Sequence, residues 1–126
     1  MSKVVKTELA PGAIGPYSQG IDIGDIIFFS GQVPLDPKSG DMPEGIEAQC
    51  QLVFKNIGGL LSSQGLDYSN VVKTTVFLDN MDDFNTMNEI YATYFVEPFP
   101  ARSAVEVARL PKGALIEVEI IAVKWA

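Results

Sequence analysis

An apolar stripe with helical spacing runs through residues 45–65 and constrains the fold more than any other feature of the chain. Its members step by four, three, four and three residues, so they share one face of a helix. They are Ile46, Cys50, Val53, Ile57 and Leu60. Gly65 suits a C-terminal cap. The pair Gly58-Gly59 costs about 1 kcal/mol per glycine relative to alanine, so we expect this helix to pack closely against a sheet there.

The stretches on both sides of this helix have the composition and the alternation of β-strands. Two runs, over 18–23 and 26–30, flank Gly24-Asp25, a pair that favours a two-residue hairpin turn. β-branched residues dominate the next run. The sequence predicts the remaining strands over 71–78, 102–108 and 115–124, with a short edge strand over 4–6.

A second helix is predicted between Asn80 and Pro98. Asn80 is a suitable N-cap, and the two aspartates that follow it lie near the positive end of the helix dipole. The apolar side chains of this segment again recur with helical spacing. They are Phe84, Met87, Tyr91 and either Tyr94 or Phe95.

The order of these elements is β-β-β-α-β-α-β-β, and the chain has no internal repeat or low-complexity tract. With 126 residues, it fits one domain over 1–126. Strands and helices in this order predict an α+β domain, in which two helices cover one face of a mixed sheet.

The composition excludes several classes of function. The chain has one cysteine and no histidine, which rules out Ser-His-Asp, Cys-His and histidine-based zinc sites. A net charge of −7 disfavours nucleic acids and anionic membranes as partners. No apolar run approaches the length of a membrane helix, and the first residues are too polar for a secretory signal. We therefore expect a soluble, cytoplasmic protein.

The last two predicted strands combine charges with large aliphatic side chains. Alternation predicts that Arg102 and Glu106 share the face away from the helices with Glu117, Glu119 and Ile121. A solvated sheet face is one interpretation. The aliphatic side chains favour a second one, in which copies of the chain pack through this face and Arg102 meets a carboxylate of the protein or of a ligand.

Three motifs resemble a known family. They are "GPYSQG" at 15–20, "SGQVP" at 30–34 and "PARSAVEVARLPKGALIEVE" at 100–119. Together they are similar to the Rid family of reactive intermediate deaminases, formerly the YjgF group, and the resemblance covers residues 11–123. It implies a chorismate-mutase-like fold and a homotrimer with clefts between its subunits.

The resemblance also implies a reaction. Deaminases of this family hydrolyse 2-imino acids such as 2-iminobutanoate and 2-iminopropanoate, together with their enamine tautomers, to 2-keto acids and ammonia. These reactive intermediates arise from pyridoxal-phosphate-dependent dehydratases. An imine carbon is already electrophilic, so the protein need only orient the substrate and move protons. No cofactor and no metal is expected.

Each site residue is implied by a match to a family position. The arginine that binds the substrate carboxylate corresponds to Arg102, the glutamate associated with the attacking water to Glu117, and the cleft tyrosine to Tyr17. The implied substrate-binding residues are Ser30, Gly31, Asn88 and Ala104. Many members have cysteine where this chain has Ala104, so only the backbone of residue 104 is expected to contact the ligand.

Other interpretations stay open at this point. Tyr17 also fits a packed aromatic residue, Ser30 a turn residue and Asn88 a residue of the helix surface. The main alternative function is a non-catalytic trimer that binds a metabolite or a protein. A translation-inhibitor or ribonuclease role is disfavoured by the negative charge and the lack of histidine. A chorismate-mutase-type rearrangement is suggested by the fold alone. It fits poorly, because chorismate carries two carboxylates and the chain has only Arg102 and Arg109 to bind them. The sequence does not specify the preferred imino acid.

Overall fold

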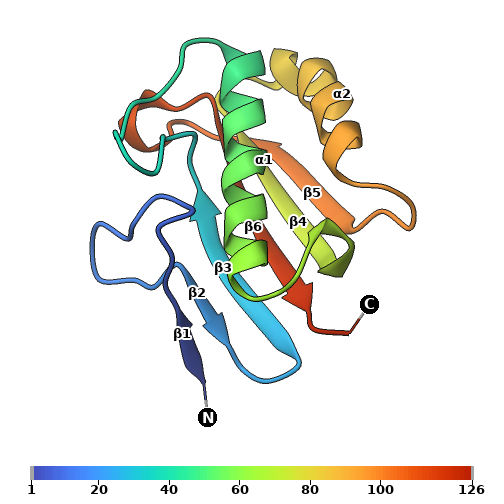
Figure 1. The fold of residues 1–126 in the computed structure, drawn as a ribbon. Coiled ribbons are helices and arrows are strands. Elements are labelled where there is room, and N and C mark those ends of the chain that lie inside the picture. The colour runs from blue at the N-terminus through green and yellow to red at the C-terminus, as the bar shows by residue number, and fades with distance from the viewer. Residues whose placement is uncertain (1, 126) are drawn as a thin grey trace.

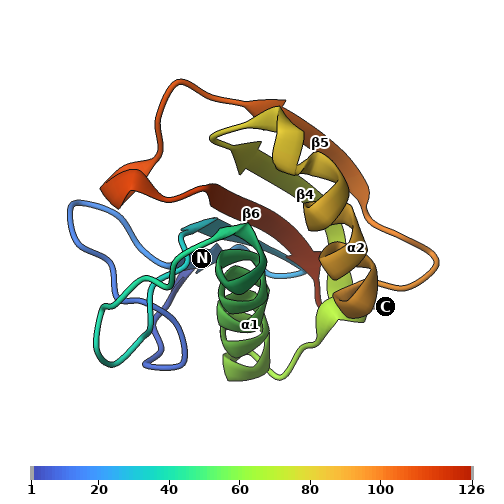
Figure 2. The ribbon, with the colours of Figure 1, turned by 90° about the horizontal axis from the view of Figure 1, so that it is seen from above.

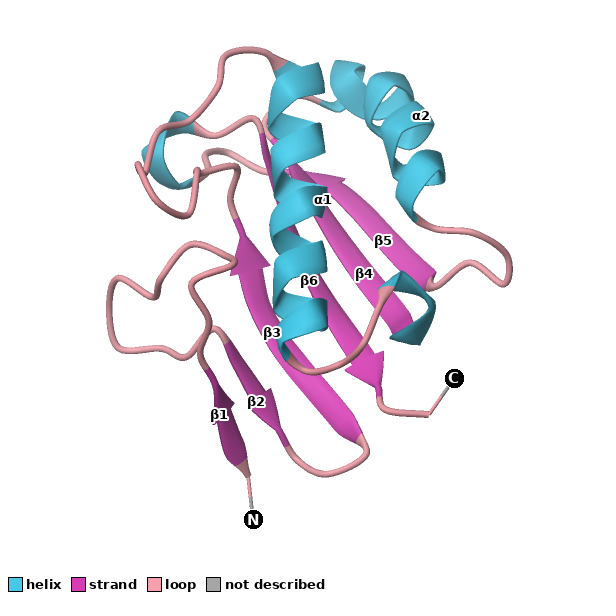
Figure 3. Cartoon of the chain, in the orientation of Figure 1, coloured by secondary structure: helices cyan, strands magenta, loops and turns pink. Residues whose placement is uncertain are grey.

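Two α-helices cover one face of a six-stranded sheet (Figures 1 and 3). The computed structural model describes residues 2–125. The strands are β1 Lys3–Val5, β2 Gly20–Asp22, β3 Ile26–Gln32, β4 Val71–Leu78, β5 Ala101–Glu106 and β6 Ile116–Val123, and the helices are α1 Ile46–Ser63 and α2 Phe84–Tyr94. Short 3₁₀ turns span Tyr68–Asn70, Met81–Asp83 and Pro111–Gly113. The predicted element order and α+β class are confirmed.

The sheet order is β1-β2-β3-β6-β4-β5, and it is mixed as predicted. All neighbouring pairs are antiparallel except β4 and β5, which run parallel. A parallel pair needs a crossover between its strands, and α2 supplies it. Seen from above, both helices lie on the same side of the curved sheet (Figure 2).

Several predicted boundaries shift by a few residues. The hairpin turn at Gly24-Asp25 forms as expected, with Ile23 N donating to Ile26 O at 3.0 Å. The second predicted helix starts as a 3₁₀ turn that precedes α2. Asn80 caps this turn, and its side chain accepts a hydrogen bond from Asp82 N. The strand predicted over 102–108 ends at Glu106.

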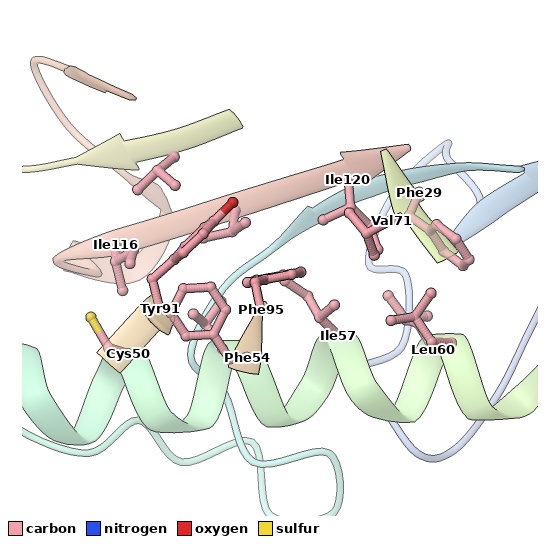
Figure 4. Close-up of a cluster of buried hydrophobic side chains, with 14 of the residues drawn as sticks. Phe29, Cys50, Phe54, Ile57, Leu60, Val71, Tyr91, Phe95, Ile116 and Ile120 are labelled. Carbon is pink, nitrogen blue, oxygen red and sulfur yellow. The ribbon is translucent and has the colours of Figure 1, made fainter. Parts of the chain in front are cut away.

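The core lies between the helices and the sheet (Figure 4). The α1 stripe is buried as predicted, except that Ile46 is only partly covered. Phe54, which the stripe did not include, is fully buried and packs edge-on against Tyr91 and Phe95. Burying such rings contributes a large part of the apolar area in a domain of this size. The aromatic contacts therefore join α1 to α2.

Neither helix among the described residues is long and apolar enough to cross a membrane. The cytoplasmic location stays a prediction.

The glycine pair of α1 was expected to pack against the sheet, but it lies against Tyr68 of a 3₁₀ turn and Leu9 of a loop. A Cβ on Gly58 would overlap the hydroxyl of Tyr68, which donates to Phe54 O at 2.7 Å. A Cβ on Gly59 would overlap the backbone carbonyl of Leu9, in the segment that follows β1. Close packing was predicted correctly, but its partner could not be read from the helix.

We expect Gly59→Ala to lower the free energy of unfolding by roughly 1–3 kcal/mol, because overpacking against a backbone group outweighs the helix propensity gained. Urea denaturation would measure the change. Gly12→Ala is the matched control, since a Cβ there meets nothing within 4 Å. Equal stability of the two variants would show that the Leu9 segment yields without cost.

Candidate active site

Arg102 lies on the face of the sheet that the helices cover, opposite to the predicted face. In the parallel β4–β5 pair it stands beside Thr74, and Ala104 stands beside Val76. Thr74 and Val76 are fully buried under the helices. The same alternation predicts Val105 on the helix-covered face, and it is instead 42% exposed on the other face. The prediction was wrong because β5 is an edge strand with no strongly apolar face, so hydrophobicity did not reveal its orientation.

Glu117 lies on the face away from the helices, which we call the open face, as predicted. Its neighbours in β6, Ile116 and Val118, are fully buried on the helix side. Across the sheet it stands beside Phe77 of β4. Arg102 and Glu117 are thus on opposite faces, with β4 between their strands. Two strand spacings alone amount to about 10 Å.

The Arg102 guanidinium is held by α2. Its Nη1 donates to Asn88 Oδ1 at 2.7 Å, and its Cζ lies 4.8 Å from the Tyr91 ring centroid and 5.5 Å from that of Phe84. Within residues 2–125, no carboxylate pairs with it, and the ion pair found there joins Lys124 to Asp22. The guanidinium therefore keeps donors for a carboxylate that the chain itself does not supply.

Glu117 faces Gly31 of β3. The ladder between β3 and β6 changes register between Phe29 and Gln32, so Gly31 sits in an irregular stretch. A Cβ on residue 31 would overlap the Glu117 carboxylate. Glycine at this position therefore leaves the space that the carboxylate occupies.

Ser30 precedes Gly31 in β3, and Tyr17 lies in the loop that leads into β2. Ser30 Oγ donates to Ser18 O at 2.6 Å, and Ser30 N donates to Gln19 O. The buried Gln19 side chain binds the backbone of Thr7 and Pro11 and so fixes this loop. Tyr17 is 51% exposed and its side chain lines a cleft of about 980 Å³ beside the N-terminal segment.

The environment of Glu117 raises the pKa of its carboxyl group. Burial is the main cause, and the negative charge of Glu119 adds to it. Both effects penalise the ionised form. Glu117 is therefore a stronger proton acceptor once ionised than a fully solvated glutamate.

The predicted site residues form two groups within one chain. The first, at β3 and β6, contains Ser30, Gly31 and Glu117, with Tyr17 in the adjoining loop, where Ser30 binds the backbone of Ser18. The second, at β5 and α2, contains Asn88, Arg102 and Ala104. Sequence reasoning missed the site contacts of Phe84 and Tyr91, which it had assigned to the core. The spacing of three between Asn88 and Tyr91 was the available signal, because such residues adjoin on a helix. Among the described residues, no cluster of three or more acidic or cysteine side chains could hold a metal ion.

Comparisons with known proteins match this chain along almost its whole length. The family model described as Endoribonuclease L-PSP matches residues 7–124. The 2-iminobutanoate/2-iminopropanoate deaminase of Escherichia coli K12 is 49% identical, over 98% of this chain and 99% of that protein. The protein of the same name from Mus musculus is 51% identical, over 97% and 91% of the two chains.

Solved structures agree with the fold. RidA from an Antarctic Psychrobacter superposes with a TM-score of 0.93 at 40% identity, covering 96% of this chain and 98% of that one. E. coli TdcF with bound serine gives 0.92 at 43% identity, covering 97% and 98%.

The raised pKa of Glu117 predicts a pH-dependent cost to stability. The folded chain binds the Glu117 proton more tightly than the unfolded chain does, so this proton stabilises the fold. Its contribution is full below about pH 4.5, the ordinary pKa of a glutamate, and is lost as the pH rises through the pKa of the folded state. We expect Glu117→Gln to raise the free energy of unfolding at pH 7.5 more than at pH 4, in urea titrations at fixed protein concentration. Glu89→Gln, on the exposed surface of α2, is the control. An equal change at both pH values would contradict the prediction.

Proposed function

This chain belongs to the Rid family, whose sequence model carries the description endoribonuclease L-PSP, and we propose that it is a 2-iminobutanoate/2-iminopropanoate deaminase. It would hydrolyse these imino acids and their enamine tautomers to 2-keto acids and ammonia. The observation that carries the proposal is the Arg102 guanidinium, which α2 holds in place and which no carboxylate of the described residues neutralises.

In the proposed reaction, Arg102 binds the substrate carboxylate through two parallel hydrogen bonds. A planar guanidinium matches a carboxylate in this way and fixes the orientation of the adjoining C2 carbon. Asn88 occupies one donor of Nη1 and so anchors the group. Ala104, in the same strand, offers its backbone without a thiol. These residues bind and orient the substrate, and none of them needs to form a covalent bond.

Glu117 is the proposed general base. It accepts a proton from the water that attacks C2 and passes it to the imine nitrogen, which gives an aminoalcohol. The hydroxyl group then loses its proton through the same carboxylate to the nitrogen, the C2–N bond breaks, and ammonia leaves as the keto group forms. A carboxylate of raised pKa suits this step, because a general base is most effective when its pKa lies near the working pH. Gly31 gives the carboxylate its space, Ser30 lies next to Gly31 in β3, and Tyr17 lines the cleft beside the N-terminal segment.

The separation of Arg102 from Glu117 supports a site shared between subunits. Each chain would present its Glu117 group to one neighbour and its Arg102 group to the other, and three copies would close such a head-to-tail ring. The open face also carries apolar side chains that a neighbour would cover, including Phe28 at 46% and Val105 at 42% exposure. We propose the homotrimer on these grounds.

A non-catalytic binding role is the second candidate. The solved structure of TdcF holds serine, a small molecule with a carboxylate, and that supports ligand binding as a function in its own right. An RNA-cleaving role is less well supported, because the chain has a net charge of −7 and no histidine.

The deaminase proposal predicts faster keto-acid release when the chain is added to a serine or threonine dehydratase that generates the transient imine. Arg102→Ala should lower kcat/KM by roughly 10²-fold, because two charge-assisted hydrogen bonds are lost. Arg109→Ala, in an exposed turn, should not change it. Equal acceleration by wild type and Arg102→Ala would exclude the proposed role of this residue, and no acceleration by wild type would leave the binding role.

The shared site predicts complementation between two inactive variants. When Arg102→Ala and Glu117→Ala chains are co-expressed in equal amounts and all assemblies are purified through one shared tag, random assembly should give about a quarter of the wild-type sites intact. Each variant alone should keep at most about 1% of the wild-type activity. A mixture as inactive as its components would mean that each site is built from a single chain.

A further inference from the structure

We infer that Tyr91, held in place by Thr74, positions the Arg102 guanidinium and thereby sets how tightly the substrate carboxylate is bound. This inference rests on the deaminase site proposed above. Tyr91 is a positioning residue, because it acts on the ligand only through Arg102.

The Arg102 guanidinium lies close to the Tyr91 ring, and of these two side chains only Tyr91 is buried. Arg102 Cζ lies 4.8 Å from the Tyr91 ring centroid, inside the range of about 6 Å at which a cation over an aromatic ring is attracted to it. Tyr91 is only 5% exposed, so its ring has little freedom to move, while Arg102 itself is exposed. A fixed ring therefore supports a long and otherwise mobile side chain.

A buried hydrogen bond fixes the ring. The Tyr91 hydroxyl lies 2.9 Å from Thr74 Oγ1, and Thr74 is fully buried. A buried hydroxyl without a partner is costly, so the two groups hold each other. Burial also raises the pKa of Tyr91, so the phenol, which is neutral at pH 7 in any case, remains able to make this bond.

The position of Thr74 ties this bond to the site. It is the register partner of Arg102 in the β4–β5 pair, so the anchor of the ring lies directly beside the residue that the ring supports. Asn88 and Tyr91, three residues apart on α2, adjoin on one face of that helix. α2 therefore contacts the guanidinium twice, at Nη1 through Asn88 and through the Tyr91 ring, and β4 fixes that ring through Thr74.

This arrangement selects one edge of the guanidinium for the ligand. Nη1 donates to Asn88, and the edge formed by Nε and Nη2 has no hydrogen-bond partner among residues 2–125. That edge presents two parallel N–H groups, which is the geometry that a carboxylate accepts. Loss of the Tyr91 contact would let the guanidinium rotate and would weaken the paired bonds.

The test compares Tyr91→Leu, Tyr91→Phe and Thr74→Val with wild type. The first removes the ring, the second keeps the ring but removes its hydroxyl, and the third removes the partner hydroxyl at similar size. Tyr94→Phe is the matched control: Tyr94 lies on the same helix, and its hydroxyl donates to Gln51, away from Arg102. The readouts are NMR measurement of rotation about the Arg102 Nε–Cζ bond, affinity for 2-oxobutanoate, and kcat and KM for the coupled imine.

We expect Tyr91→Leu to speed this rotation and to weaken 2-oxobutanoate binding roughly 3- to 30-fold, with KM rising more than kcat falls. Tyr91→Phe and Thr74→Val should change the rotation rate and the affinity in the same direction but by smaller amounts, and Tyr94→Phe should change neither. In an Arg102→Ala background, Tyr91→Leu should cause no further loss of affinity, because the group it positions is absent.

The outcomes separate this inference from the proposed function. Unchanged rotation and affinity in Tyr91→Leu, or losses that simply add to those of Arg102→Ala, would overturn the positioning role even if wild type is an active deaminase. If wild type fails to accelerate imine hydrolysis but rotation and 2-oxobutanoate affinity depend on Tyr91 as described, the deaminase proposal falls and the positioning of Arg102 stands. If Tyr91→Leu does not fold, the two milder variants decide.

Discussion

The parallel pairing of β4 with β5 is the constraint on which the candidate site depends. It sets Arg102 beside the buried Thr74, and it requires a crossover that brings α2 over the end of the sheet. The same helix then supplies Asn88 and Tyr91 to the guanidinium. A shift of one residue in this register would turn Arg102 to the open face and away from all of these contacts.

A second close fit shapes the other half of the site. The irregular stretch of β3 places Gly31 against Glu117, where no larger residue has room. Burial and the nearby Glu119 raise the pKa of Glu117, and the absence of a Cβ at residue 31 leaves the carboxylate its position. The fold thus holds a carboxylate in a place where its ionised form is disfavoured, which is a common arrangement for a group that exchanges protons.

The sheet keeps these two halves apart within one chain. If Arg102 and Glu117 lay on one face, they could pair with each other and leave neither group for a ligand. Their separation keeps the guanidinium available and the carboxylate without a cation. A site that joins them through a neighbouring subunit would bring the two charges together only around a bound substrate, which is consistent with a reaction that needs no cofactor.

The sequence by itself determined the elements, their order and the face that each helix buries. The α1 stripe and the run of β4 are strongly periodic or strongly apolar, so burial followed directly from pattern. It also placed Glu117 correctly, because Ile116, Val118 and Ile120 leave no doubt about the buried face of β6. The motifs identified the family and predicted the residues of the site, although they gave no contacts.

Only the tertiary structure decided where Arg102 points and what holds it. Alternation along β5 specifies which residues share a face but not which face that is, since Ala104 and Val105 are both weak signals on an edge strand. Pairing with β4 made the choice, because the small Ala104 fits beneath α2 beside Val76 while Val105 stays exposed. The same applies to Gly59 and to Tyr91, whose partners are distant in sequence and are defined only by packing.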